Sequence, residues 1–158
     1  MNFAHQAAVE LRLAQERFDR STGHLTEELS GFSPAEEAMT TCQHVAHCAQ
    51  VVDWFIEGAF RSEGFDMDFD SQISRVRAVR SLAEARGWFN RSMNAAVAFL
   101  SARSDGELSA PIAAGPVMGG HARFAIVSAI VDHTAHHRGA LTVYARTNGI
   151  TPPDPYLE

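Results

Sequence analysis

Residues 130–156 read IVDHTAHHRGALTVYARTNGITPPDPY, and this stretch decides both the fold and the position of its chemistry. Its first part has the period of an amphipathic helix. Measured from Ile130 at about 100° per residue, one helix face carries Ile126, His133, Thr134, His137, Leu141 and Tyr144. The Asn-Gly pair at 148–149 and the Pro-Pro pair at 152–153 then stop the pattern. We predict a helix over residues 123–147.

Two histidines of this helix lie on one face. His133 and His137 are four residues apart, so their side chains stand about 40° apart and one turn from each other. Burying two imidazoles there is costly unless each has a partner, and a divalent metal ion is one such partner. Histidines that bond to each other or to water explain the same spacing without a metal. His136 lies about 100° from His137, so we expect it on a flank or in solvent.

Periodicity and capping signals predict three further helices. Apolar or small residues recur every three or four positions across residues 3–29. The sequence S-P-A-E at residues 33–36 has the pattern of a capping box with proline at the first helical position, which predicts a helix over residues 34–60. A second box, S-L-A-E at residues 81–84, predicts a helix over residues 82–102.

The remaining segments lack a helical period. Residues 61–79 are acidic with scattered aromatic side chains and are predicted to be a connection, while residues 107–120 are predicted to form a loop or a brief hairpin. Four amphipathic helices in a chain of 158 residues predict an all-α fold, a four-helix bundle forming a single domain over residues 1–158. The core of such a bundle is where facing helices build metal sites.

His47, on the predicted helix 34–60, is the best candidate for a third metal ligand. It lies on a largely apolar or small-polar face, and with the pair on the last helix it gives a three-histidine set with open positions for water or substrate. His44 lies on nearly the same face and competes for this role. If it is not a ligand, His44 either hydrogen-bonds near the metal or lines the pocket, or it is a partly exposed surface histidine.

Other side chains near this face are weaker candidates. Arg138 is placed to hold an anionic substrate or a carboxylate of the bundle. Tyr144 and Trp54 are expected to be core residues with a polar group near the site. Asp132 either orients a ligand imidazole or is a solvated acid, and Asp53 is predicted to point away from the site.

Composition excludes several kinds of chemistry. All 13 basic residues are arginine, so Schiff-base and P-loop lysine chemistry are absent. The net charge of −6 argues against a nucleic-acid partner. The chain has neither an apolar run long enough for a membrane span nor the features of a signal peptide, so we expect a cytoplasmic protein. Cys42 and Cys48 are expected to be reduced, partly buried thiols, and the sequence identifies no base beside Cys48.

The sequence H-V-A-H at residues 44–47, D-H-T-A-H-H-R-G-A-L-T-V-Y-A-R at 132–146 and N-G-I-T-P-P-D-P-Y at 148–156 resembles the DinB/YfiT-like family of metalloenzymes. The resemblance covers essentially the whole chain. It implies a four-helix bundle that holds a divalent ion, commonly nickel, zinc or iron, through one histidine of the second helix and two of the last. Carried onto this chain, these ligands are His47, His133 and His137. Many relatives have glutamine where this chain has Ala140, so no polar role transfers to that position.

The resemblance also implies a homodimer and two classes of activity. Characterised relatives include thiol-dependent transferases and isomerases that use bacillithiol, mycothiol or glutathione. Because the open positions of such a metal ion bind a thiol or water and lower its pKa, we expect a metal-dependent hydrolase or a thiol-dependent transferase that acts on small electrophiles, with Arg138, His44 and Tyr144 as candidate substrate contacts. The alternatives are a non-catalytic stress-response protein in which the ion stabilises the bundle, and a metal-free dimer whose apolar surface binds a partner.

Overall fold

The computed structural model describes residues 2–157. These residues form helices and loops without a β-strand, so the predicted all-α fold is confirmed. The α-helices are α1 Phe3–Thr22, α2 Thr41–Phe60, α3 Phe69–Ala78, α4 Leu82–Ser101, α5 Asp105–Ser109 and α6 Ile126–Thr147. Two short 3₁₀ helices, η1 Glu27–Leu29 and η2 Arg123–Ala125, precede α2 and α6.

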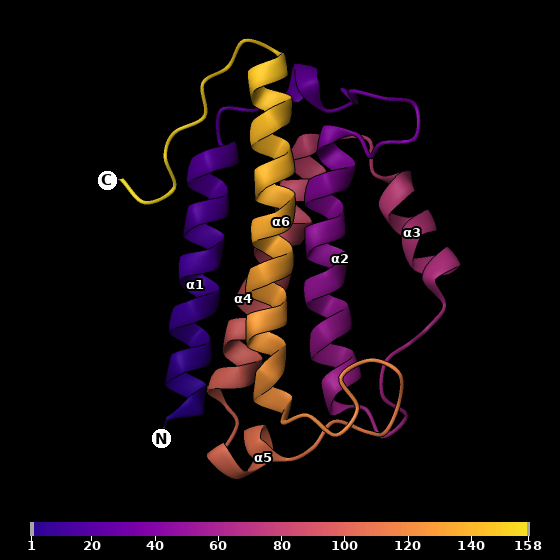
Figure 1. The fold of residues 1–158 in the computed structure, drawn as a ribbon, viewed down its shortest axis with the longest axis vertical. Coiled ribbons are helices and arrows are strands. Elements are labelled where there is room, and N and C mark those ends of the chain that lie inside the picture. Colours follow the sequence, from indigo (N-terminus) through magenta and orange to yellow (C-terminus); the bar gives the residue numbers. More distant parts are fainter. Residues whose placement is uncertain (1, 158) are drawn as a thin grey trace.

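The four long helices pack in a ring. α1 packs against α4 and α6, and α2 packs against the same two helices, so α1 and α2 are diagonal to each other. In Figure 1, α1 and α6 run upward and α2 and α4 run downward. The segment containing α3 returns the chain along the outside of the bundle from the end of α2 to the start of α4. As a result α2 and α6 are antiparallel neighbours, which brings the start of α2 beside the middle and end of α6.

Apolar side chains from all four long helices form the core. Leu11 and Phe18 of α1, Val45 of α2, Met93 of α4 and Leu141 of α6 are completely buried. The Phe18 ring packs against the Phe89 ring with 4.6 Å between the ring centroids. Burial of such side chains stabilises a fold by about 25 cal/mol per Å² of apolar surface, so this core is the main source of stability.

The first helix ends at Thr22, so the prediction that it extends to residue 29 was wrong. The Thr22 hydroxyl donates to the Phe18 carbonyl oxygen at 2.8 Å, and Gly23 caps the helix. Leu25 continues the apolar period and is buried, but it lies outside the helix. The apolar spacing therefore predicted correctly that Leu25 is buried, although the helical hydrogen bonds of α1 end before it.

The second helix begins at Thr41 and not at residue 34. Thr40 and Gln43 form a complete capping box, in which each side chain accepts a hydrogen bond from the other residue's backbone N–H. The Ser33 hydroxyl donates to the carbonyl oxygens of Ala35 and Ala38, so it stabilises a turn. The segment thus contains two capping patterns, Ser33-Glu36 and Thr40-Gln43, and the second one caps α2.

The segment predicted as a connection, residues 61–79, contains the ten-residue helix α3. Asp68 caps this helix by accepting from the Ser71 backbone N–H, and Val76 is its one buried residue. A helix with so little buried surface produces almost no apolar period, which is why the sequence pattern missed it. Residues 107–120 form the end of α5 and a loop, and Pro111 pairs with Ala122 in an isolated antiparallel bridge.

Helix α4 ends one residue before the end of the predicted helix 82–102. Helix α6 begins three residues after the start of the predicted helix 123–147 and ends where predicted. Within residues 2–157, none of the helices combines the length and the apolar character that crossing a membrane requires.

Replacing Gly58 by alanine should destabilise the protein by about 1–3 kcal/mol, because an added methyl group overpacks this contact. A Cβ at Gly58 would lie 2.2 Å from Cδ1 of the Phe65 ring, which itself packs against Trp54. Gly139→Ala is the matched control: it is also a helical glycine, but a Cβ there meets nothing within 4 Å. That substitution should stabilise α6 by about 1 kcal/mol through helix propensity. Urea unfolding followed by circular dichroism measures both changes, and equal effects would contradict the Phe65 constraint.

Candidate metal centre

Three histidines from two helices meet in the half of the bundle where α2 begins. His47 comes from α2, and His133 and His137 come from successive turns of α6. The nitrogen atoms that they offer all lie within 4.8 Å of one another. The ring centroids are 4.9 Å apart for His47 and His133, 4.9 Å for His47 and His137, and 4.5 Å for His133 and His137. The structure thus brings together the three predicted ligands, while their binding of a metal stays a prediction.

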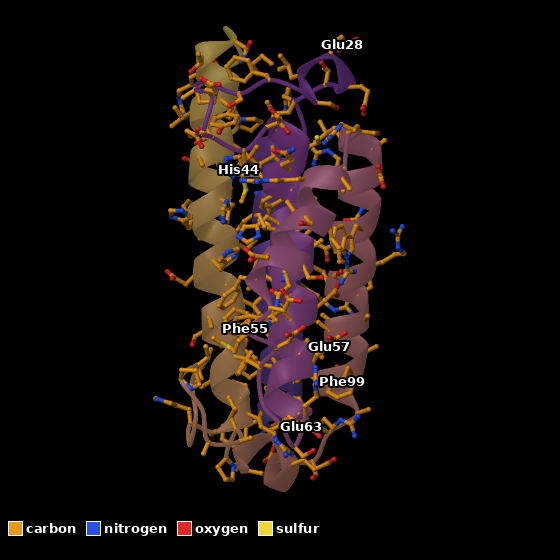
Figure 2. All side chains as sticks on the ribbon, turned by 90° about the vertical axis from the view of Figure 1, so that its right-hand side faces the viewer. Glu28, His44, Phe55, Glu57, Glu63 and Phe99 are labelled. Carbon is orange, nitrogen blue, oxygen red and sulfur yellow. The ribbon has the colours of Figure 1, made fainter. Side chains whose placement is uncertain are left out.

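The three side chains differ in how far solvent reaches them. His137 is buried, whereas His47 and His133 are half-buried. Thr134 of α6 is buried beside His137. Figure 2 shows His44 in the upper part of the bundle, where α2 faces α6. Solvent therefore reaches part of His47 and His133 but little of His137.

Burial keeps these imidazoles neutral. It lowers the pKa of His137 to about 2, with His133 and His47 as the next largest causes. Burial also lowers the pKa of His133 to about 4, assisted by the electrostatic effects of His47 and His136. The pKa of His44 falls to about 4 for the same main reason, and that of His47 is lowered too. Neutral imidazole is the form that binds metal ions.

Among residues 2–157, one fully buried imidazole nitrogen has no hydrogen-bond partner. His47 Nδ1 is buried and unpaired, and the nearby Gln50 amide donates to Gln72 Oε1 at 2.8 Å. Leaving such an atom unpaired costs about 1–3 kcal/mol. A metal ion satisfies imidazole nitrogens directly, and three neutral nitrogens suit zinc, nickel or iron. The donor set and the unpaired nitrogen both fit a divalent metal ion.

A chain of polar contacts extends from His137 away from the three-histidine group. His44 Nδ1 lies 2.8 Å from His137 Nδ1, and His44 Nε2 lies 3.0 Å from the Tyr144 hydroxyl. The Tyr144 hydroxyl donates to the Met39 carbonyl oxygen at 2.8 Å. His44 therefore contacts a predicted ligand but does not belong to the three-membered group.

Other predicted residues of the last helix lie around the outside of the site. Arg138 packs over the Tyr156 ring at 5.8 Å from its centroid, and its Nη2 donates to the Tyr156 hydroxyl at 3.5 Å. Arg138 is thus engaged with the C-terminal segment. Asp132 is exposed, and His136 is exposed with its ring 5.0 Å from that of His137, as the helix angle predicts.

Two further residues do not join the site. Trp54 was expected near it, but it lies seven residues beyond His47 along α2, or about 10 Å. Its Nε1 donates to the Asp66 carbonyl oxygen at 2.7 Å. Cys48 is completely buried, and burial raises the pKa of its thiol far above the usual range. This cysteine cannot supply a thiolate at neutral pH.

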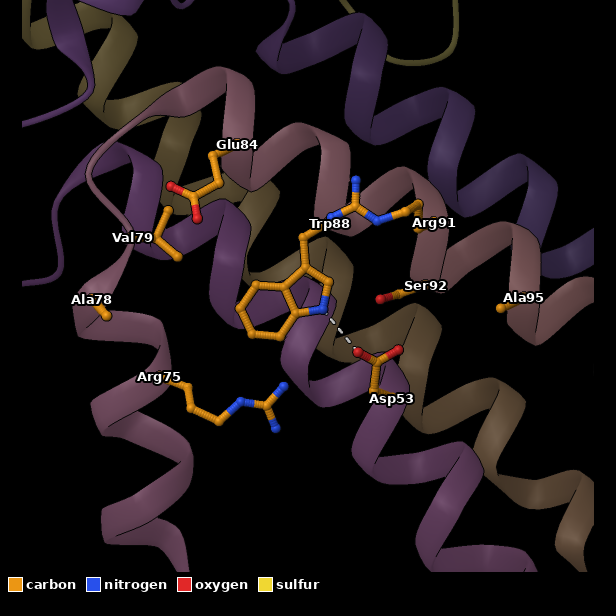
Figure 3. A pocket seen from close by; sticks show the side chains of 9 residues that line it. All are labelled: Asp53, Arg75, Ala78, Val79, Glu84, Trp88, Arg91, Ser92 and Ala95. Carbon is orange, nitrogen blue, oxygen red and sulfur yellow. Dashed lines mark hydrogen bonds between the residues drawn. The ribbon is translucent and has the colours of Figure 1, made fainter.

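A cleft of about 660 Å³ lies apart from the histidines, between α2, α3 and α4 (Figure 3). Trp88 crosses it and donates from Nε1 to Asp53 Oδ2 at 2.8 Å, while the Arg75 guanidinium lies 5.4 Å from the Trp88 ring centroid. Asp53 points away from His47, as the helix angle predicts. Sequence reasoning did not find this cleft, because it depends on α3, which the pattern missed.

The fold and the site define a helical-bundle protein with three histidines that could hold a metal ion. The family model of the DinB superfamily matches residues 10–141. This chain belongs to the DinB superfamily.

Solved structures with the same fold are distant in sequence. A crystal structure of a protein from Streptococcus pneumoniae is similar with a TM-score of 0.72 and 14% identity, covering 90% of each chain. A crystal structure of an uncharacterized protein from Clostridium difficile 630 has the same TM-score and identity, covering 90% of this chain and 95% of that one. No curated protein matches significantly. At this identity the likeness shows the fold alone.

In the metal-free protein, the free energy of unfolding should fall as the pH decreases from about 7 to about 5. In the unfolded chain histidine takes up protons around pH 6.5. The folded protein keeps His44 and His133 neutral down to about pH 4, and His137 to about pH 2. The unfolded state then binds more protons, so each group removes at most about 1.4 kcal/mol of stability per pH unit, and less because solvent reaches the site.

Urea unfolding with a chelator present measures this slope. The window from about pH 7 to about pH 5 is chosen because carboxylates of the unfolded chain titrate mainly below it. A His133→Leu/His137→Leu double variant should show a shallower slope than the wild type. A wild-type profile that is flat across the window would contradict neutral, buried histidines.

Proposed function

We propose that this protein binds one divalent metal ion through His47, His133 and His137, and that the site activates a thiol or water for attack on a small electrophile. The observation that carries the proposal is the approach of three neutral imidazoles to within 4.8 Å. When two imidazole nitrogens bind the same ion, each at about 2.1 Å, the two nitrogens lie about 3 Å from each other. The rings therefore need little movement to share an ion.

The number of ligands favours catalysis over a purely structural role. A structural zinc site usually has four protein ligands, while a catalytic site has three and keeps a position open. The group here has three members. A divalent ion held by three imidazoles supplies Lewis acidity, which lowers the pKa of a thiol or water bound beside it. His47 and His133 are half-buried, so solvent reaches part of each ring.

If the nucleophile is a thiol, it comes from solution. Cys42 and Cys48 are both buried, and the Cys42 thiol donates to the Val79 carbonyl oxygen at 3.5 Å. Neither thiol is available to a substrate at the histidines. A low-molecular-weight thiol of the bacillithiol, mycothiol or glutathione type is the co-substrate that the family resemblance supplies. A metal-dependent hydrolase, in which water replaces the thiol, is the second form of this proposal.

The remaining expectations also stay proposals. These are a cytoplasmic homodimer, a small-molecule substrate, and substrate contacts by His44, Tyr144 and Arg138. Arg138 is engaged with Tyr156 of the C-terminal segment, whereas His44 contacts His137 and Tyr144 contacts His44, so the first two residues are the better candidates.

Metal analysis of protein purified without a metal-binding tag tests the binding step. The wild type should contain about one zinc, nickel or iron ion per chain, and a His133→Ala/His137→Ala double variant should contain almost none, because one ligand cannot hold the ion. His24→Ala removes an exposed histidine remote from the site in sequence and serves as the control. If the folded double variant keeps its full metal content, the ligand assignment is wrong.

The catalytic step needs a separate assay. Metal-loaded protein is mixed with a small electrophile and with glutathione, bacillithiol or mycothiol in turn, and loss of the free thiol is followed. Turnover that requires both the metal and one thiol supports the transferase form, and turnover without thiol supports the hydrolase form. Full metal occupancy with neither activity supports the non-catalytic alternative, in which the ion stabilises the bundle.

A further inference from the structure

The hydrogen-bond donors and acceptors around Tyr144 can be assigned from its single hydroxyl proton. Tyr144 is buried, and its hydroxyl donates that proton to the Met39 carbonyl oxygen at 2.8 Å. The same oxygen lies 3.0 Å from His44 Nε2. Because the proton is already used, the hydroxyl must accept from this nitrogen, so His44 carries its proton on Nε2.

This assignment fixes the direction of the next contact. A neutral imidazole with its proton on Nε2 has a bare lone pair on Nδ1. His44 Nδ1 lies 2.8 Å from His137 Nδ1, which is a normal hydrogen-bond distance. His137 must therefore donate from Nδ1, and the lone pair of its neutral ring is left on Nε2.

We propose that His44 and Tyr144 are positioning residues for the metal centre: they form a hydrogen-bond relay that selects the tautomer of His137 and holds its Nε2 lone pair free to bind the ion. The proposal rests on the proposed function, since it assumes that His137 is a ligand. It gives His44 a role other than metal binding.

The reverse direction of the relay fails at two points. If His44 donated from Nδ1 to His137, its Nε2 would need the Tyr144 hydroxyl proton, and the Met39 carbonyl oxygen would lose its donor. A neutral His137 would then carry its proton on Nε2, where it could not bind a metal. The hydrogen bonding of these part-buried groups and metal binding by His137 therefore select the same tautomer.

Packing fixes the orientation of the relay as well as its direction. The Tyr144 ring meets the His44 ring edge-on, with 5.0 Å between centroids and an interplanar angle of 89°. Phe32 contacts the Tyr144 ring in the same manner at 5.6 Å and 87°. Met39 directly precedes Thr40, whose capping box begins α2. The terminal acceptor is thus held by the backbone at the start of the helix that carries His44.

The tautomers can be observed without any metal. Two-bond proton–nitrogen correlations on ¹⁵N-histidine protein treated with chelator distinguish a protonated Nδ1 from a protonated Nε2. We expect His137 to be protonated on Nδ1 and His44 on Nε2. The opposite assignment at either residue would overturn the relay.

Zinc affinity tests the consequence for binding. His44→Leu removes the acceptor for His137, so the affinity for Zn²⁺ should fall about 10- to 100-fold, as is typical when a group that orients a ligand is lost. His44→Asn keeps an acceptor near the place of Nδ1 and should recover part of the loss. Tyr144→Phe removes the hydroxyl but keeps the ring, and it should weaken binding less than His44→Leu.

The matched control is His136→Asn. His136 has its ring 5.0 Å from that of His137 but is exposed, and so it tests the loss of a neighbouring imidazole without loss of the relay. Its Zn²⁺ affinity should equal that of the wild type. Competition with a chelator of known affinity gives all these values, and thermal unfolding of each metal-free variant shows whether it is folded.

The outcomes separate this proposal from the proposed function. If the wild type binds Zn²⁺ tightly and folded His44→Leu and His44→Asn bind it equally tightly, the relay has no role in binding and the inference is wrong. If the wild type binds no metal, the proposed function fails and this inference fails with it, whichever tautomers are observed. Loss of affinity in His44→Leu with recovery in His44→Asn supports the relay, because a general loss of packing would not be rescued by a polar side chain.

Discussion

The antiparallel contact between α2 and α6 is the constraint on which the site depends. His47 alone is one imidazole on a helix, and His133 with His137 is an incomplete pair. Only when the start of α2 lies beside the middle of α6 do the three rings come within reach of one ion. The capping box of Thr40 and Gln43 fixes where α2 begins, and the packing of the buried core fixes how closely α2 and α6 approach each other. A shift of one turn along either helix would separate the nitrogens by about 5 Å.

The electrostatics of the site follow from what surrounds these rings. Burial is the main cause that lowers the pKa of all four imidazoles, and neighbouring imidazoles lower the pKa of His44, His133 and His137 further. A protein that needed a positively charged histidine here would place a carboxylate beside it. The described hydrogen bonds of His44 instead run to His137 and to Tyr144, whose hydroxyl donates to the Met39 carbonyl oxygen. This environment keeps nitrogen lone pairs available at neutral pH.

The sequence was sufficient for the parts of the protein governed by short-range periodicity. The last helix and its inward-facing histidines follow from the spacing of apolar residues. The angular position of His47 on its own helix identified it as the third candidate ligand. The start of α2 was predicted wrongly because Ser33-Glu36 and Thr40-Gln43 are both plausible caps, and only tertiary packing decides between them. The short helix α3 buries one side chain and gave no signal. The contacts of His44 with His137 and Tyr144 join residues 93 and 100 positions apart, so no local pattern contains them.

The relay ends on a backbone carbonyl oxygen, and this has a consequence for how the protein can vary. Every amino acid at position 39, proline included, supplies the same acceptor, so the methionine side chain is free to change without breaking the chain of hydrogen bonds. The constraint falls on the path of the main chain between η1 and α2. Insertions or deletions there would move the acceptor even if every histidine were kept. Among related sequences, the length of this loop should therefore vary less than its composition.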